Sequence, residues 1–337
     1  MKRERPMKQS NGKSNDIYSC CKILRLFWVT FSLLLCLGVT AVRAQDILPE
    51  KAKRDHNSGP VYSSTAMENL MKFIPVSSPM PSLFKDTIDN VIEDPKGELN
   101  PFWEKVTKMD RPVRIVHLGD SHVRGHVFPY VVRKLLEEDF GNEAVIDYSV
   151  SYQTSGIAHE TGRTGIVYHI LGVNGATCES FCKPDRISDI SALHPDLIIL
   201  SFGTNEANGR NYRRSDHLLQ MSNLVGHLKD KCPDAVFLMT TPPGAYMRSG
   251  RRNKVINTRT PLVVDTEKEF AKTNGMAIWN MYDVVGGKTF ACKNWTAAGM
   301  FQKDKIHFTR EGYTLQGLLL HEAFIKAYND YLATRFD

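Results

Sequence analysis

A serine, a histidine and an aspartate in this sequence have the types and spacing that nucleophilic catalysis requires. Ser121 lies in a Gly-Asp-Ser-His run, whereas Asp304 and His307 share one later stretch of the 337-residue chain. A serine hydroxyl is a poor nucleophile at neutral pH and needs an adjacent base. His307 can supply that base, and Asp304 can orient the imidazole and stabilise its charged form. The three residues therefore predict attack by a serine on a carbonyl carbon.

The oxyanion that such an attack creates needs hydrogen-bond donors aimed at it. The sequence offers the backbone N–H groups of Ser121 and Gly175 and the side-chain amide of Asn205. A glycine at position 175 lets the backbone approach a substrate closely, because it carries no Cβ. We therefore predict an oxyanion hole made by these three residues, with Gly172 as the alternative to Gly175.

The elements that must position these residues are strands and helices in alternation. Apolar runs predict strands over Arg114–Leu118, Gly165–Leu171, Asp196–Phe202, Ala235–Thr240 and Met276–Trp279. Helical patterns lie between and after them, over Val127–Asp139, Arg213–Lys231, Pro261–Thr273 and Arg310–Arg335. This alternation predicts a five-stranded parallel sheet covered on both faces. Ligands bind such sheets at the carboxyl ends of the strands. We therefore expect the four stretches that contain Ser121, Gly175, Asn205 and the Asp304–His307 pair to meet at that edge of the sheet.

The first 44 residues differ from the rest in charge and hydropathy. They contain eight Lys and Arg against two acidic residues, which accounts for the whole formal net charge of +6. An apolar run over Leu26–Val42 follows the basic residues, and a Val-Arg-Ala sequence precedes Gln45. This pattern predicts a secretory signal peptide, with an uncleaved N-terminal membrane anchor as the alternative. Either interpretation predicts an exported protein, in the periplasm, the cell envelope or outside the cell, which contacts a membrane only through this segment.

The remainder of the chain divides into two parts. Residues 45–98 are polar or rich in proline and predict a linker and a short helical extension, with an amphipathic helix over Ser64–Phe73. Residues 99–337 form the predicted globular domain, in which 140–164 and 242–256 are long connections, the first with an extra hairpin as one interpretation. Because the chain after the leader is neutral, the sequence predicts no nucleic-acid partner.

Four cysteines lie in the predicted domain, at positions 178, 182, 232 and 292. An even number in an exported protein permits two disulfides, with three possible pairings. Their spacing lacks the paired pattern of zinc sites, so we predict no metal ion. We also predict no cofactor.

The stretches around Ser121, Gly175, Asn205 and His307 together resemble the sequence blocks of the SGNH hydrolases, the GDSL-like esterase and lipase superfamily. The resemblance covers about residues 112–335. It implies a flavodoxin-like, three-layer α/β/α fold with a doubly wound sheet, and ester hydrolysis through an acyl-serine. It also implies that Asp304 is the carboxylate of the triad and that Gly175, in its Gly-Ala-Thr context, is the glycine donor of the oxyanion hole.

One departure from the family pattern is His122, where many members carry Leu or Ile. A structural histidine beside the start of a helix is the favoured interpretation of it, and a substrate contact is the alternative. The Gly-Asp-Ser-His form, together with the export signal, is similar to exported bacterial members that act on acylated glycans.

The sequence therefore predicts an exported serine esterase that removes short acyl groups, acetyl above all, from a carbohydrate or cell-envelope polymer. Its expected partner is an acylated glycan or another small ester. Three alternatives stay open: an O-acyltransferase with the same triad, a lipase or lysophospholipase, and a non-catalytic glycan-binding module.

Overall fold

The computed structural model describes residues 73–146, 156–209, 211–251 and 253–336. The predicted leader lies outside these ranges, as does the helix expected over Ser64–Phe73, apart from its last residue. Within the described ranges, no helix is both long enough and apolar enough to span a membrane.

The core of the fold is a six-stranded sheet in the order β1-β10-β7-β6-β2-β5. The strands are β1 (Ile92–Glu93), β2 (Pro112–Gly119), β5 (Gly165–Gly172), β6 (Leu197–Ser201), β7 (Val236–Thr240) and β10 (Ala277–Trp279). The five strands from β10 to β5 run parallel to one another, which confirms the predicted sheet. β1 adds a sixth strand at one edge, antiparallel to β10.

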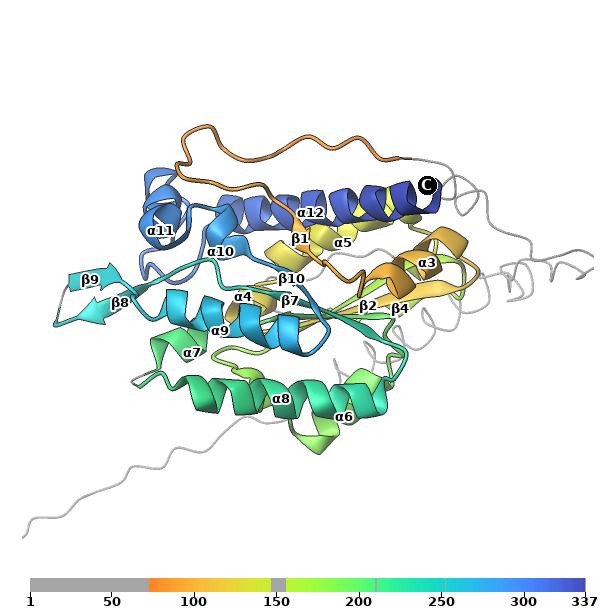
Figure 1. The fold of residues 1–337 in the computed structure, drawn as a ribbon, viewed down its shortest axis with the longest axis horizontal. Coiled ribbons are helices and arrows are strands. Elements are labelled where there is room, and N and C mark those ends of the chain that lie inside the picture. The colour runs from red at the N-terminus through yellow and green to blue at the C-terminus, as the bar shows by residue number, and fades with distance from the viewer. Residues whose placement is uncertain (1–72, 147–155, 210, 252, 337) are drawn as a thin grey trace, which may run out of the picture. The chain divides into compact units, whose positions relative to one another are not determined.

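Helices cover both faces of the sheet, so the fold is the expected three-layer α/β/α arrangement (Figure 1). One face carries α3 (Asn100–Lys108), α5 (Val127–Phe140), α10 (Met281–Val284), α11 (Gly287–Ala297) and α12 (Arg310–Phe336). The other carries α6 (Pro184–Ser191), α8 (Arg214–Lys231) and α9 (Thr260–Thr273). Side chains alternate between the faces along each strand. In β2, Ile115 therefore packs in the α5–α12 layer and Val116 in the α8 layer.

α12 packs closely along α5, and a glycine makes this contact possible. A Cβ on Gly317 of α12 would lie 2.6 Å from the Cβ of Val131 and 2.8 Å from the carbonyl oxygen of Phe128, both in α5. Any larger side chain at position 317 would push the two helices apart, because neither of those atoms belongs to a flexible side-chain end.

Residues 73–98 contribute to the sheet domain more than a linker would. Phe84 and Ile92 are buried in the core, and Ile92 belongs to β1. Asn90 is 3% exposed and binds two elements at once. Its Oδ1 accepts from Trp279 Nε1 at 2.8 Å, and its Nδ2 donates to the carbonyl oxygen of Leu319 at 2.7 Å. Through these two hydrogen bonds, Asn90 links β10 to α12.

The long connections contain regular structure as well. Two short strands, β3 (Val145–Ile146) and β4 (His159–Glu160), pair antiparallel within the 140–164 segment, as a hairpin there would require. β8 (Tyr246–Ser249) and β9 (Asn253–Ile256) form a hairpin within 242–256. α10 and α11 occupy part of the stretch before His307, in which the sequence predicted no helix or strand. α11 forms because Trp295 and Ala291 give it a buried face.

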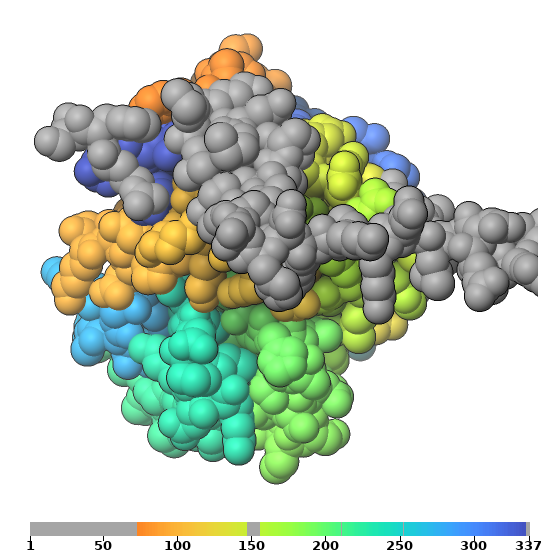
Figure 2. Space-filling view, turned by 90° about the vertical axis from the view of Figure 1, so that its right-hand side faces the viewer, coloured from red at the N-terminus to blue at the C-terminus, as the bar shows by residue number. Residues whose placement is uncertain are grey.

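The edge of the sheet at which the strands begin is the one that Figure 2 shows, with α3 in gold above the ends of α6 and α8 in green. The strands end at the opposite edge, where all the predicted site residues follow them. The structure has free thiols at Cys178, Cys182, Cys232 and Cys292. None of the three possible disulfide pairings is therefore formed among these four cysteines.

Candidate active site

The ends of β2 and β6 mark the point at which the winding of the sheet reverses. Gly119 of β2 pairs with Gly172 of β5 and with Ser201 of β6, so the three strands end at the same level. α5, after β2, covers one face, whereas α8, after β6, covers the other. Adjacent strands whose connections leave to opposite faces open a crevice at their carboxyl ends, and ligands bind there.

Ser121 begins the short helix α4 (Ser121–Arg124) directly in this crevice. The preceding residue, Asp120, caps the helix, since its Oδ1 accepts from the backbone N–H of His122 at 2.8 Å. The first backbone N–H groups of a helix have no partner within the helix, so that of Ser121 is suited to bind an anion.

The structure brings the predicted nucleophile, base and carboxylate together. Nε2 of His307 lies 2.9 Å from Oγ of Ser121, and Nδ1 of His307 lies 2.6 Å from Oδ2 of Asp304. The other carboxylate oxygen, Oδ1, accepts from the backbone N–H groups of Ile306 and His307, both at 2.9 Å. The chain of contacts from Asp304 through His307 to Ser121 has the geometry of a serine-hydrolase triad.

A buried aromatic cluster holds the loop that carries His307. Phe308 is fully buried, and its ring centroid lies 5.0 Å from that of Trp295 and 4.5 Å from that of Phe301. Phe301 and Phe308 also form an antiparallel bridge, which closes the loop at its base. The position of the histidine is therefore fixed by the residue that follows it.

The electrostatics around the imidazole favour its role as a base. Partial burial alone would raise the pKa of Asp304, but the hydrogen bonds from the His307 ring and from two backbone N–H groups lower it below its ordinary value. His122 lies beside His307, with ring centroids 5.5 Å apart, and burial lowers its pKa to about 3. His122 is therefore neutral near pH 7. Its Nδ1 lies 3.0 Å from Oη of Tyr313, as a structural histidine would.

Gly175 and Asn205 lie at the same edge as Ser121. Gly175 has a φ of +72°, in the left-handed region, and a Cβ placed there would meet no atom within 4 Å. The alternative donor, Gly172, packs differently, because its Cβ would lie 2.2 Å from the backbone nitrogen of Arg124. Gly172 therefore serves the packing of α4 on the sheet, and Gly175 faces open space.

Asn205 stands in the helix α7 (Thr204–Asn208), and its amide is already engaged. Nδ2 donates to Oδ2 of Asp120 at 3.1 Å and to the carbonyl oxygen of Ala176 at 2.9 Å. These two bonds aim the amide at the crevice. One of them must be shared or released when the amide binds an oxyanion, because an amide nitrogen carries only two protons.

Three buried carboxyl groups lie behind the crevice. Burial, with the Glu206 carboxyl nearby, raises the pKa of Asp120 to about 8, although the N–H of His122 favours its ionised form. Burial also raises the pKa of Glu206, and raises that of Glu267 well above its ordinary value. Glu206 accepts from the backbone N–H of Gly203 at 3.0 Å and so caps α7.

A buried polar chain below the site was not predicted from the sequence. His117 in β2 lies 2.8 Å from Oη of Tyr168 in β5 and 2.6 Å from Oγ of Ser201 in β6. Oγ of Ser201 lies 2.6 Å from Oγ1 of Thr240 in β7. Burial lowers the pKa of His117 to about 3, so its ring is neutral. Because side chains alternate between the two faces of a strand, His117 lies on the same face of β2 as Ile115. A polar residue at such a core position was the sequence feature that could have indicated this buried chain.

In the described ranges, one group of side chains has ligand atoms close enough together to coordinate a metal ion. Single ligand atoms of Cys178, Glu206 and His217 lie within 4.8 Å of one another, and all three residues are buried. Thiolate, carboxylate and imidazole are ligands of zinc. Both oxygens of Glu206 already accept backbone N–H groups, so an ion would compete with the cap of α7. The prediction of no metal site stays a prediction.

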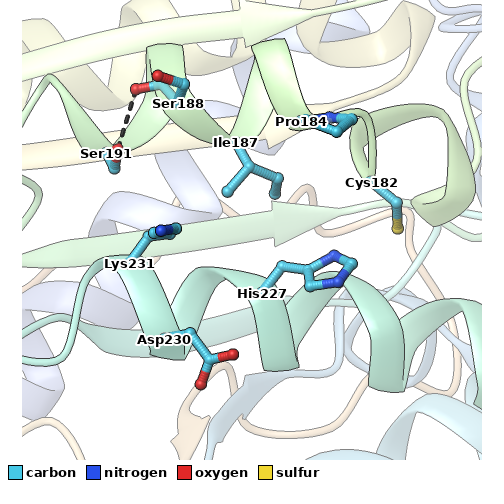
Figure 3. Close-up of a pocket in the computed structure, with 8 residues that line it drawn as sticks. All are labelled: Cys182, Pro184, Ile187, Ser188, Ser191, His227, Asp230 and Lys231. Carbon is cyan, nitrogen blue, oxygen red and sulfur yellow. Dashed lines mark hydrogen bonds between the residues drawn. The ribbon is translucent and has the colours of Figure 1, made fainter.

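Two pockets bear on where a ligand binds. The pocket in Figure 3, of about 450 Å³, lies between α6 and α8, with Ile187 and His227 on opposite sides of it. None of its residues is a predicted site residue. A pocket of about 650 Å³ includes Asp304 and Ile306 on one side and the β8–β9 hairpin on the other, and it adjoins the triad.

Comparison with known proteins gave one family and several structures. A model described as the GDSL-like lipase/acylhydrolase family matches residues 118–315. A peptidoglycan O-acetylesterase has a TM-score of 0.59 at 18% identity, over 68% of this chain and 96% of its own. A lipase/acylhydrolase from Enterococcus faecalis has a TM-score of 0.42 at 20% identity, over 64% of this chain and 96% of its own. An acetylxylan esterase from Geobacillus stearothermophilus has a TM-score of 0.42 at 16% identity, over 64% and 94%. Among curated proteins, no match was found.

Proposed function

The chain belongs to the GDSL-like lipase/acylhydrolase family, and on this premise we propose that it hydrolyses short acyl esters, acetyl above all, on a carbohydrate or cell-envelope polymer. Membership confirms the resemblance found in the sequence and makes the protein a serine ester hydrolase. The observation that carries the proposal is the pair of contacts of His307, 2.9 Å to Ser121 and 2.6 Å to Asp304.

In the proposed mechanism, Oγ of Ser121 attacks the ester carbonyl and transfers its proton to Nε2 of His307. Asp304 stabilises the imidazolium that forms. His307 then protonates the departing sugar oxygen, which leaves an acyl group on Ser121. Water attacks this acyl-serine with His307 again as the base, and the carboxylic acid and the free serine are released.

The negative charge on the carbonyl oxygen is stabilised by the N–H groups of Ser121 and Gly175 and by the amide of Asn205. Burial favours the neutral forms of Asp120, Glu206 and Glu267. A neutral carboxyl does not oppose the charge that develops in front of it, whereas an ionised one would.

A hydroxyl-rich partner fits the surface beside the triad. The β8–β9 hairpin exposes Arg248, Ser249, Asn253 and Lys254. Hydrogen bonds and charge are what such side chains offer a sugar, and a long acyl chain would gain little from them. We also propose that the leader exports the protein, so that its substrates are glycans of the envelope or of the surroundings.

The proposal is tested by incubating the purified chain with acetylated oligosaccharides and measuring acetate release. The wild-type protein is expected to release acetate, and Ser121→Ala is expected to release none while it keeps the wild-type circular dichroism spectrum. A serine-directed phosphonate should label Ser121. Transfer of acetyl to an added sugar without net release would indicate an acyltransferase, and labelling at another serine would contradict the triad.

Export is tested separately by expressing the full chain and sequencing its N-terminus. A mature protein that begins at Gln45 is expected in the exported fraction. An uncut chain that stays with membranes would favour the anchor, and an uncut chain in the cytoplasm would contradict export.

A further inference from the structure

Two cations face each other in the β8–β9 hairpin. Arg248 and Lys254 are directly opposite in the register of this antiparallel pair. Like charges at opposed positions disfavour strand pairing. Within the described ranges, Arg248 has no hydrogen-bonding or charged partner, and the ammonium group of Lys254 donates only to the backbone carbonyl oxygen of Lys303. The hairpin therefore holds positive charge that the described chain does not neutralise.

The hairpin is attached to the loop of the triad. The backbone N–H of Tyr246 donates to the carbonyl oxygen of Lys305 at 2.9 Å, and Lys254 binds the carbonyl oxygen of Lys303. Lys303 and Lys305 flank Asp304 on either side in the sequence. The two opposed cations are thus held against the segment that positions the catalytic base.

A third cation completes the group. Nη1 of Arg259 donates to the carbonyl oxygens of Ala207 and Gly209, at the end of α7, the helix that carries Asn205. The 650 Å³ pocket is lined by Arg248, Lys254 and Arg259, with Asp304 as its one acidic residue among the described ones. Asp304 offsets only one of these three positive charges, and its oxygens are directed to His307 and to two backbone N–H groups.

We propose that this pocket is a subsite for an acidic sugar unit, whose carboxylate or sulfate Arg248 and Lys254 bind while Ser121 attacks an ester on the same glycan. The inference rests on the proposed glycan esterase function and specifies its substrate class. The volume lies within the range of about 300–1,000 Å³ typical of small-ligand sites. A guanidinium group offers a planar fork of donors to an oxyanion, and Arg259, already held by two carbonyl oxygens, keeps the local potential positive.

The test compares acetylated oligosaccharides of equal length that are neutral, carboxylated or sulfated. The wild-type protein is expected to show a kcat/KM for acetate release that is about 10-fold or more higher on an acidic substrate than on the neutral one at low salt. The ratio should fall as salt screens the charges. Preference for the carboxylated over the sulfated substrate, or the reverse, identifies the anion. Equal values on all three would overturn the inference.

Two variants locate the effect. Arg248→Gln is expected to reduce the acidic-to-neutral ratio towards one. Arg251→Gln removes the same charge from the same hairpin, outside the pocket, and is expected to leave the ratio within about twofold of wild type. An equal reduction by both variants would indicate a diffuse charge effect and would contradict a subsite.

A binding measurement separates this inference from the proposed function. Calorimetry with Ser121→Ala and a de-acetylated uronic-acid oligosaccharide needs no turnover. Binding that Arg248→Gln abolishes, together with no acetate release by the wild type, would support the subsite and contradict the esterase proposal. Acetate release without any binding of the acidic oligosaccharide would overturn the subsite alone.

Discussion

Asp304 is the residue whose role a conservative substitution tests most sharply. In Asp304→Asn the amide oxygen can still accept from the N–H groups of Ile306 and His307, so the turn is kept. The amide nitrogen would then face Nδ1 of His307 and force the proton onto Nε2, the atom that must accept the proton of Ser121. We expect kcat to fall by about 10³–10⁴-fold with little change in KM, measured on a chromogenic acetyl ester. Near-normal rates would limit Asp304 to shaping the loop.

Asn205→Ala tests the oxyanion hole at the same scale. The substitution removes one of three proposed donors, and we expect kcat to fall by about 10²-fold or more. KM should change less, because the hydrogen bond strengthens chiefly in the transition state. Steady-state kinetics over several acetyl esters gives both constants. A change confined to KM would assign Asn205 to substrate binding.

The sequence predicted which residues meet but not how their neighbours hold them. Ser121, Asp304 and His307 were predictable because a serine nucleophile, a carboxylate and a histidine base are the residue types that a triad requires. Each of them also follows a strand or a loop at the carboxyl edge of the sheet. The bonds of Asn205 to Asp120 and Ala176 were not, since they join separate segments through side-chain orientations that no local pattern encodes. The same holds for the polar chain through His117, which crosses four strands.

At the scale of elements, long apolar strands were predicted well and short ones were not. β6 is apolar through Leu197–Leu200, a pattern that a parallel strand buried on both faces produces. β1 has only two residues and follows a proline-rich stretch, so no periodicity marks it. Its place in the sheet depends on Asn90 and on its pairing with Trp279, which are contacts distant in sequence.

Asn90→Ala should show how much that segment contributes. The substitution leaves the buried indole N–H of Trp279 without its acceptor, and it removes a donor from the carbonyl oxygen of Leu319 and from Oε2 of Glu322. We expect the free energy of unfolding to fall by about 2–4 kcal/mol, measured by urea denaturation. Asp89→Ala, which removes only an exposed ion pair with Lys326, should cost less than about 1 kcal/mol. Equal losses for both would contradict the structural role of Asn90.

Glu267 in α9 makes the free energy of unfolding depend on pH. Burial, with Glu206 and Asp120 nearby, raises its pKa, so the folded protein keeps a proton that the unfolded chain releases above about pH 4.3. The unfolded state then binds fewer protons, and this group lowers the free energy of unfolding as pH rises from that value. Glutamine does not titrate. We therefore expect the stability of Glu267→Gln relative to wild type to increase between pH 4 and pH 8, measured by urea midpoints. A constant difference across this range would contradict a raised pKa.

At the scale of the whole molecule, the surface around the triad should decide which esters are cleaved. A long acyl chain needs a continuous apolar groove to gain about 0.8 kcal/mol for each buried CH₂ group. The hairpin beside Asp304 exposes chiefly charged and polar side chains instead, with Val255 as an exposed apolar one. We expect kcat/KM to be highest for acetyl esters and to fall through butyryl, octanoyl and palmitoyl esters of one alcohol. A steady rise with chain length, without acetate release from glycans, would favour a lipase.

The close packing of α12 on α5 has a consequence for when the enzyme becomes active. Ser121 stands six residues before α5, and His307 stands three residues before α12, so one helix pair brings nucleophile and base together across 186 residues of chain. During synthesis, every nascent chain that ends before His307 carries the serine without its base. Activity therefore emerges only after the last helix has left the ribosome and docked, and a chain still unfolded on its way across a membrane would be inert towards esters.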